Sequence, residues 1–353
     1  MVTNNIEEYK GVYVFAQQVD NEISGIALEL LGKGKELAAK LETEVTAVLI
    51  GYNVKGLADK LAEYGADKVI LVDDPKLETY RTEPYAHALA SVIEKYKPEI
   101  VLVGATAIGR DLGPTVSARV QTGLTADCTQ LEIGDFDMKV KVGDEFVNKH
   151  YERQLYQIRP AFGGSIIATI VNPDHRPQMA TVRDGVMKKE ILDENYKGEV
   201  IKHDVAKYVP ETDYVVKVLE RHVEASKNNL KGANIVIAGG YGVGSKEGFD
   251  LLFEFAKEIH AEVGASRAAV DAGWISHDRQ IGQTGVTVRP KVYIACGISG
   301  AIQHISGMKD SGIIISINSD PNAPINQIAD YIITGTVEEV IPKMIKYYKK
   351  NSK

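Results

Sequence analysis

Short apolar runs alternate with stretches of helical periodicity through the first hundred residues. The apolar runs predict buried strands, and the stretches between them carry apolar residues at the spacing of amphipathic helices. The predicted strands are residues 12–16, 45–51, 68–73 and 99–104, and the predicted helices are 24–41, 57–64 and 84–96. Strands separated by helices form parallel sheets with right-handed crossovers, so this half is predicted to be a doubly wound α/β domain.

The pattern changes after the fourth strand. A glycine turn is predicted to lead into a helix over 109–122. From 131 to 171 the hydrophobic period falls to two, which predicts antiparallel strands added to the same sheet. Residues 172–232 are polar and contain three prolines. We place the linker there, near 205–215, and predict domains over 1–208 and 209–353.

The second half repeats the alternation of strands and helices. Strands are predicted at 233–239, 263–265, 292–296, 313–317 and 331–334, and helices at 246–260 and 337–350. The last helix carries an apolar face that would pack on the domain or on a partner, consisting of Val340, Ile341, Met344, Ile345 and Tyr348. The predicted fold is therefore α/β, with two doubly wound, mainly parallel sheet domains, the second of them Rossmann-like.

Composition narrows the functional class. The 353 residues are 44% apolar and 25% charged, which is typical of a soluble globular protein with two domains. The net charge of −7 argues against a general binder of nucleic acid or anionic membranes. No apolar run approaches the ~18 residues of a membrane span, and the N-terminus lacks a signal-peptide pattern. We therefore expect no membrane span and a cytoplasmic location.

The two cysteines, Cys128 and Cys296, lie far apart in apolar or small-residue runs. Two cysteines cannot hold an iron–sulfur cluster alone, and no CxxC pair suggests zinc. We expect both to be buried free thiols and expect no metal site in this chain.

Residues 264–304 carry the strongest candidate chemistry. They contain two glycine turns, IGQTG and GISG, with Arg267 among small residues and His304 after the second turn. Glycines let backbone N–H groups approach phosphate oxygens, and hydroxyl side chains add donors. The segment predicts a site for a large anionic ligand with a polar ring. Two plainer interpretations stay open, a surface arginine at 267 and a structural histidine at 304.

Two further glycine turns are weaker signals. GATAIGRD, at 104–111, follows a strand as a nucleotide site would, but Thr106, Arg110 and Asp111 suit helix capping and a subunit contact equally, and we favour the latter. In GGYGVG the glycines at 239, 240, 242 and 244 do not match the GxGxxG spacing.

Several long motifs in order resemble the alpha subunit of electron transfer flavoproteins. They are VDAGW (270–274), QIGQTG (280–285), GISGAIQH (297–304) and INSDPNAPI (317–325). GATAIGRDLGPTVSARVQTGLTADCTQL in the first half resembles the first-domain signature of the same family, so the resemblance covers the whole chain. It implies one FAD in the C-terminal domain, and a beta subunit that contacts the first domain and carries a second FAD or AMP.

The resemblance also assigns flavin contacts to individual residues. Arg267 would stabilise the reduced, anionic flavin, the Thr284 hydroxyl would reach flavin N5, and His304 would face the pyrimidine O2. Asn318, Asp320 and Thr336 would hold the adenosine half. The full set is Ser266, Arg267, Gln280, Ile281, Gln283, Thr284, Gly285, Ser299, Gly300, Ala301, Ile302, Gln303, His304, Asn318, Asp320 and Thr336. No residue is assigned as a catalytic acid or base, because the cofactor carries the chemistry.

The resemblance implies one of two modes of electron transfer. In the bifurcating mode, NADH reduces the beta-subunit flavin, and electrons pass to ferredoxin or flavodoxin and, through this FAD, to an acyl-CoA dehydrogenase such as butyryl-CoA dehydrogenase. In the ordinary mode the protein relays electrons from acyl-CoA dehydrogenases, as in fatty acid β-oxidation. Trp274 replaces the phenylalanine of the mitochondrial-type pattern and favours bifurcation. Tyr241 replaces an arginine, which puts a phosphate contact at that turn in doubt.

Two other functions are remote alternatives. An NAD-dependent enzyme of deoxyhypusine-synthase-like fold requires a lysine in the pocket, and residues 266–290 contain none. A nucleotide-sensing or adaptor protein built on the first sheet would be colourless when purified.

Overall fold

The structure is a computed structural model that describes residues 6–142, 145–161, 166–221 and 228–351. The chain divides into two compact units. The N-terminal unit comprises residues 1–161 and 167–221, and the C-terminal unit comprises residues 162–166 and 222–353. The predicted domain limits at 208 and 209 stay predictions.

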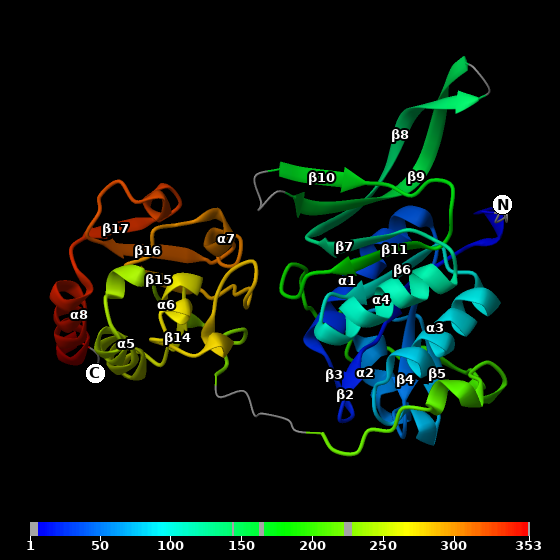
Figure 1. The fold of residues 1–353 in the computed structure, drawn as a ribbon, viewed down its shortest axis with the longest axis horizontal. Helices are drawn as coiled ribbons and strands as arrows, with labels where there is room; N and C mark the ends of the chain where they lie inside the picture. Colours follow the sequence, from blue (N-terminus) through cyan, green and yellow to red (C-terminus); the bar gives the residue numbers. More distant parts are fainter. Residues whose placement is uncertain (1–5, 143–144, 162–165, 222–227, 352–353) are drawn as a thin grey trace. The chain divides into compact units, whose positions relative to one another are not determined.

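A seven-stranded parallel sheet forms the centre of the N-terminal unit, in the order β12-β5-β4-β1-β6-β11-β7 (Figure 1). The strands are β1 (Val12–Phe15), β4 (Val45–Gly51), β5 (Lys68–Asp73), β6 (Ile100–Gly104), β7 (Leu124–Cys128), β11 (Gln178–Val182) and β12 (Glu199–Lys202). The helices are α1 (Gly25–Leu41), α2 (Ala58–Glu63), α3 (Thr82–Tyr96) and α4 (Ala107–Arg119).

Helices cover both faces of this sheet, so the doubly wound prediction is confirmed. Alternate strand residues pack into two separate cores. Val12 and Val14 meet α1 and α2 on one face, whereas Tyr13 and Phe15 meet α3 and α4 on the other. Because both faces are buried, the inner strands β1, β4 and β6 are continuous apolar runs, as buried parallel strands are.

The prediction for residues 131–171 was wrong in one respect. These strands do not extend the parallel sheet but form a separate sheet in the order β10-β9-β8, made of β8 (Gln130–Val142), β9 (Glu145–Ala161) and β10 (Ile166–Ile170). β8 and β9 pair antiparallel along nearly their whole length and so satisfy each other's backbone groups. Their far ends are exposed, with Phe146 71% accessible.

Three strands of the N-terminal sheet were not predicted, namely β7, β11 and β12. β11 lies between Pro177 and Arg183 in the stretch 172–232 that the sequence analysis described as polar, yet all of its residues are buried. Its Gln178 is polar, and Oε1 accepts a hydrogen bond from the backbone N–H of Leu155 at 3.0 Å, whereas Nε2 is buried without a hydrogen-bond partner among the described residues. A buried glutamine next to a proline leaves no strand signal in the sequence. A short ribbon, β2 (Gln18–Val19) with β3 (Glu22–Ile23), follows β1.

The C-terminal unit contains a five-stranded parallel sheet in the order β14-β13-β15-β16-β17 (Figure 1). Its elements are β13 (Ile235–Gly239), α5 (Lys246–Glu258), β14 (Glu262–Ala265), α6 (Arg267–Asp271), β15 (Val292–Cys296), α7 (Ile302–Ile305), β16 (Ile313–Asn318), β17 (Tyr331–Thr334) and α8 (Val337–Asn351). α5 and α8 pack on one face. The predicted apolar face of α8 is confirmed except at Tyr348, which is 38% exposed.

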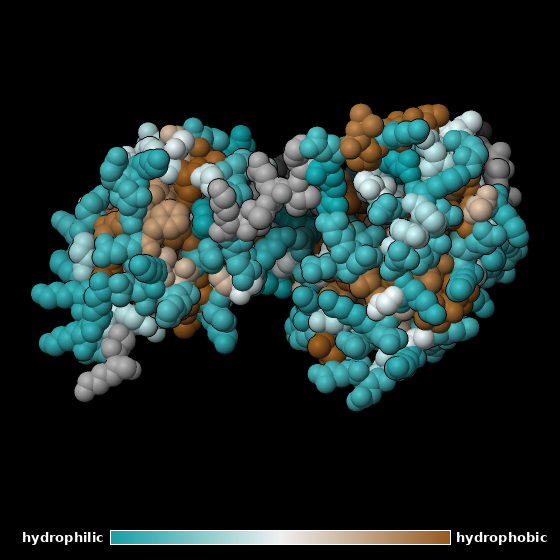
Figure 2. All heavy atoms as spheres, turned by 90° about the horizontal axis from the view of Figure 1, so that it is seen from below, coloured by the Kyte–Doolittle hydropathy of each residue, from teal (hydrophilic) through white to brown (hydrophobic). Residues whose placement is uncertain are grey.

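Polar side chains dominate the visible surface of both units (Figure 2). Among the described residues, no helix combines the length and apolar character needed to cross a membrane. Cys128 and Cys296 are buried free thiols, as predicted, and burial raises the pKa of each to about 12.

Candidate functional site

The site forms at the carboxyl edge of the C-terminal sheet, where the strand order reverses between β13 and β15. Ligands of open α/β sheets bind at such switch points. The glycine turn after β13 packs directly on the turn after β15, because the Gly240 N–H donates to the Cys296 carbonyl at 2.8 Å and the Gly242 N–H donates to the Gly297 carbonyl at 2.9 Å. A Cβ on Gly240 would lie 2.2 Å from the Gly297 carbonyl oxygen, so this contact excludes side chains.

Beside these turns lies a pocket of about 410 Å³. That volume is in the ordinary range for small-molecule and cofactor sites. The pocket is lined by Ser266, Arg267, Ala268, Asp271, residues 280–284, Ile298, Ser299, Ala301, Gln303 and His304. Three motifs that are separate in sequence therefore meet in one cavity, and most of the predicted flavin contacts lie on its wall.

Backbone hydrogen bonds bring these motifs together. Ser266 is the N-cap residue of α6, and its N–H donates to the Gly239 carbonyl at 2.9 Å. The Ile281 N–H donates to the carbonyl of Ala265 at 2.8 Å, and the Gln283 N–H donates to the carbonyl of Gln303 at 2.7 Å. The turn at 280–285 is thus attached to β14 on one side and to α7 on the other.

Arg267 lies at the mouth of the pocket. Its side chain is 70% exposed, and Nε lies 3.3 Å from Asp271 Oδ2, one helical turn further on. The described residues offer no other acceptor to this guanidinium. Its remaining N–H groups can therefore bind an anionic group of a ligand in the pocket.

The turn at 280–285 presents a hydroxyl group to the pocket. Gln280 is buried, and its Nε2 donates to Thr284 Oγ1 at 2.9 Å. Because Oγ1 accepts this bond, the Thr284 hydroxyl hydrogen is available to an acceptor in the pocket. Gly285 keeps the turn compact, since a Cβ there would lie 2.2 Å from the Gln280 carbonyl oxygen.

His304 is 6% exposed, and both of its ring nitrogens have protein partners. Nδ1 lies 3.0 Å from the Ile281 carbonyl oxygen, and Nε2 lies 2.9 Å from the Tyr293 hydroxyl. A carbonyl only accepts, so Nδ1 carries the hydrogen and Nε2 accepts from Tyr293. Burial lowers the pKa of His304 to about 4, which keeps the ring neutral at pH 7. A hydrogen bond to flavin O2 would require exchange of one of these partners, and it stays a prediction.

The other predicted residues lie outside the pocket wall. Asn318 Nδ2 donates to the Ile298 carbonyl at 2.8 Å, and its Oδ1 accepts from the Asp320 N–H at 3.0 Å. Thr336 forms a reciprocal capping box with Glu339 at the start of α8. Gly300, at φ +91°, packs against the backbone of Ile325. Ile302 is half exposed on α7. Roles in holding the adenosine half stay predictions for Asn318, Asp320 and Thr336.

The structure adds wall residues that the sequence analysis did not assign as flavin contacts, namely Ala268, Asp271, Gly282 and Ile298. Asp271 could have been found from the sequence, since it lies in the VDAGW motif one helical turn after Arg267. The two residues that depart from the mitochondrial-type pattern also prove to be neighbours. The rings of Tyr241 and Trp274 stack with centroids 5.0 Å apart. The two residues that differ from the mitochondrial-type pattern therefore pack against each other.

The glycine motif of the first half has a structural role in the N-terminal unit. Thr106 caps α4, its Oγ1 accepting from the Gly109 N–H at 2.9 Å and donating to Gln17 Oε1 at 2.6 Å. A Cβ on Gly109 would lie 1.8 Å from the Gly104 carbonyl oxygen. Gly109 therefore allows α4 to pack against the end of β6, in agreement with the capping interpretation.

Comparison with known proteins identifies both halves of the chain. The family model "Electron transfer flavoprotein domain" matches residues 12–208, and "Electron transfer flavoprotein FAD-binding domain" matches residues 229–309. The chain is 49% identical to the electron transfer flavoprotein subunit alpha of Thermoanaerobacterium thermosaccharolyticum, over 98% of this chain and 99% of the relative. It is 48% identical to the same subunit of Clostridium acetobutylicum, over 98% of each chain.

A third relative carries a more specific description. The chain is 41% identical to "Lactate dehydrogenase (NAD(+),ferredoxin) subunit LctC" of Acetobacterium woodii, over 96% of this chain and 76% of that protein.

Proposed function

The chain belongs to the electron transfer flavoprotein alpha-subunit family and has that family's FAD-binding domain, and from this premise we propose that it exchanges electrons between a beta subunit and an acyl-CoA dehydrogenase. The observation that supports this most directly is the pocket in which three family motifs meet. Bound FAD would supply the one- and two-electron chemistry. The protein would bind the ring, present the Thr284 hydroxyl to it and place the Arg267 charge at its edge.

We further propose that the protein takes part in electron bifurcation with NADH and ferredoxin or flavodoxin. Two observations favour this mode, namely Trp274 in place of the phenylalanine of the mitochondrial-type pattern and the relative whose name couples NAD(+) to ferredoxin. With only two cysteines, this chain holds no cluster that could receive the low-potential electron. The acceptor would therefore be a separate protein. An ordinary relay from acyl-CoA dehydrogenases is the alternative.

The flavin content of the protein purified with its beta subunit tests both proposals. Absorbance after denaturation, with nucleotide chromatography, counts FAD and AMP in the complex. Two FAD per heterodimer support bifurcation, and one FAD with one AMP support the ordinary relay. A colourless complex that cannot be reconstituted with FAD would overturn the electron-transfer proposal.

Arg267→Ala is expected to lower the reduction potential of the flavin bound in this unit. An exposed guanidinium that donates to an anionic reduced ring would stabilise it by about 1–2 kcal/mol, which corresponds to roughly 40–90 mV for one electron. A spectroelectrochemical titration measures this shift. Lys343→Ala is the matched control, since it removes one exposed positive charge from α8 in the same unit. Equal potentials in wild type and Arg267→Ala would exclude the assigned role.

A further inference from the structure

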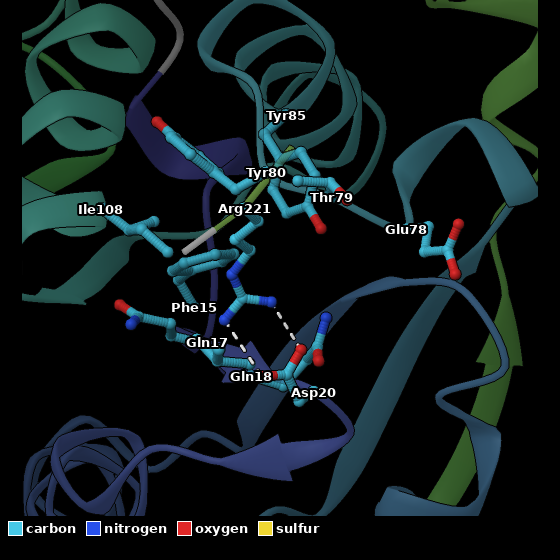
Figure 3. A pocket seen from close by; sticks show the side chains of 11 residues that line it. Phe15, Gln17, Gln18, Asp20, Glu78, Thr79, Tyr80, Tyr85, Ile108 and Arg221 are labelled. Carbon is cyan, nitrogen blue, oxygen red and sulfur yellow. Dashed lines mark hydrogen bonds and ion pairs between the residues drawn. The ribbon is translucent and has the colours of Figure 1, made fainter. Parts of the chain in front are cut away.

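Each unit has a cavity at the switch point of its sheet, and each cavity has a buried glutamine bonded to a threonine hydroxyl. In the N-terminal unit, a crevice of about 240 Å³ lies where the strand order reverses between β1 and β6, and Gln17 lines it (Figure 3). Thr106 Oγ1 accepts from the Gly109 N–H at 2.9 Å and donates to Gln17 Oε1 at 2.6 Å. The hydrogen of the Thr106 hydroxyl is therefore used within the protein.

In the pocket of the C-terminal unit, the corresponding bond runs in the opposite direction. Gln280 is 3% exposed, and its Nε2 donates to Thr284 Oγ1 at 2.9 Å. Thr284 is exposed and lines the pocket. Within the part of the chain that the structure describes, no group accepts a hydrogen bond from this hydroxyl. Its hydrogen is therefore left for an acceptor in the pocket.

The backbone holds Gln280 in place without help from a ligand. The Gln280 N–H donates to the His277 carbonyl at 3.0 Å, and the Gln280 carbonyl accepts from the Val286 N–H at 2.7 Å. Gly285 leaves room for the glutamine side chain, since a Cβ on it would lie 3.1 Å from Gln280 Cγ. Both backbone polar groups of Gln280 are thus paired, and its side chain lies against the turn that carries Thr284.

We propose that Gln280 is a positioning residue, which turns the hydrogen of the Thr284 hydroxyl toward the pocket so that this hydroxyl donates to the flavin ring. The inference rests on the proposed function, because it takes FAD as the occupant of the pocket. A glutamine that presented Oε1 to Thr284 would accept the hydrogen, as Gln17 accepts it from Thr106. The pocket would then face only the lone pairs of Oγ1.

The direction of this bond affects how readily the flavin is reduced. Reduction adds electron density to the ring, so a donor that faces the ring binds the reduced form more strongly than the oxidised form. Gln280 should therefore raise the reduction potential through Thr284. A residue that only supported the fold would change the stability of the unit without this dependence on a hydroxyl at 284.

Spectroelectrochemical titration of the protein purified with its beta subunit tests the inference. Thr284→Val removes the hydroxyl and keeps the shape of the side chain, and it should lower the equilibrium constant for one-electron reduction roughly two- to tenfold. Gln280→Met removes the donor and keeps the length of the side chain, and it should lower the same constant roughly twofold. In the Thr284→Val background, Gln280→Met should have no further effect, because no hydroxyl remains to be turned.

Three further variants make the test specific. Thr284→Ser keeps the hydroxyl, so Gln280→Met should lower the potential in this background as it does in wild type. Gln280→Glu can only accept once its carboxyl group ionises with rising pH, so its effect should then be larger with Thr284 present than in the Thr284→Val background. Gln327→Met is the matched control, since it removes an exposed glutamine of the same unit outside the pocket wall, and it should have the wild-type potential.

The outcomes separate this inference from the proposed function. A protein that binds FAD and has the wild-type potential in Gln280→Met would overturn the role of Gln280 and leave the electron-transfer proposal intact. An equal fall for Gln280→Met in wild type and in the Thr284→Val background would also overturn it, because the effect would not pass through the hydroxyl. A complex that takes up no FAD would overturn both.

Discussion

Replacing Gly240 with alanine is expected to destabilise the C-terminal unit by about 3 kcal/mol, the upper range for overpacking a well-packed interior. The added Cβ would lie 2.2 Å from the Gly297 carbonyl oxygen and 2.7 Å from Ile298 Cα. Both are backbone atoms, so no side chain can rotate to relieve the contact. FAD binding should weaken too. The added Cβ would displace the turn after β15, and that turn continues into the pocket wall at Ile298 and Ser299.

Urea unfolding of the flavin-free protein measures this effect. Trp274 is the chain's single tryptophan and lies in the C-terminal unit, so its fluorescence reports on that unit. Gly244→Ala is the matched control in the same turn. A Cβ there meets no atom within 4 Å, but the residue has φ +85° and would carry a conformational penalty of about 1–2 kcal/mol. If Gly240→Ala proves no more damaging than Gly244→Ala, close packing of the two turns is not what requires glycine.

The C-terminal unit is expected to lose about 3 kcal/mol of stability between pH 7.5 and pH 4 because of His304. Burial lowers the pKa of this histidine from 6.5 to about 4 in the folded unit. Between these values the unfolded chain binds a proton that the folded unit does not. Falling pH therefore favours unfolding across this window, and below about pH 4 the contribution is lost completely.

Carboxylates titrate in the same pH range and also change the free energy of unfolding. The contribution of His304 is therefore measured as the difference between the pH profiles of wild type and a variant that lacks this histidine. His304→Gln keeps a polar side chain but removes the titrating group, so its unfolding free energy should vary less between pH 7.5 and pH 4. His277→Gln removes an exposed histidine from the same unit and serves as control. Parallel pH profiles for wild type and His304→Gln would show that the buried imidazole does not limit acid stability.

The sequence predicted the parallel strands well because their signal is local. Residues 45–51 and 292–296 are continuous apolar runs, and the structure has strands with these same bounds. β11 and β12 carry no such signal, since β11 begins with the buried polar residue Gln178 and β12 is an edge strand with exposed residues. Their positions depend on pairing with β6 and β5, which a local pattern does not contain.

The same distinction applies to the candidate site. The glycine motifs are local, so the sequence located the pocket wall at 280–284 and at 299–304. The environment of His304 is not local. Its partners are the Ile281 carbonyl and the Tyr293 hydroxyl, from two other segments. Only the fold shows that the imidazole is neutral and fully paired.

The order of strands in the N-terminal sheet also constrains how the chain is made. β11 lies between β6 and β7, although β7 ends at residue 128 and β11 begins at residue 178. At roughly 5–20 residues per second, a ribosome would need several seconds to synthesise the stretch between them. During that time β6 and β7 would each present an unpaired edge, the kind of surface on which nascent chains associate wrongly. The growing polypeptide should therefore engage chaperones at this stage, until β11 is inserted between β6 and β7.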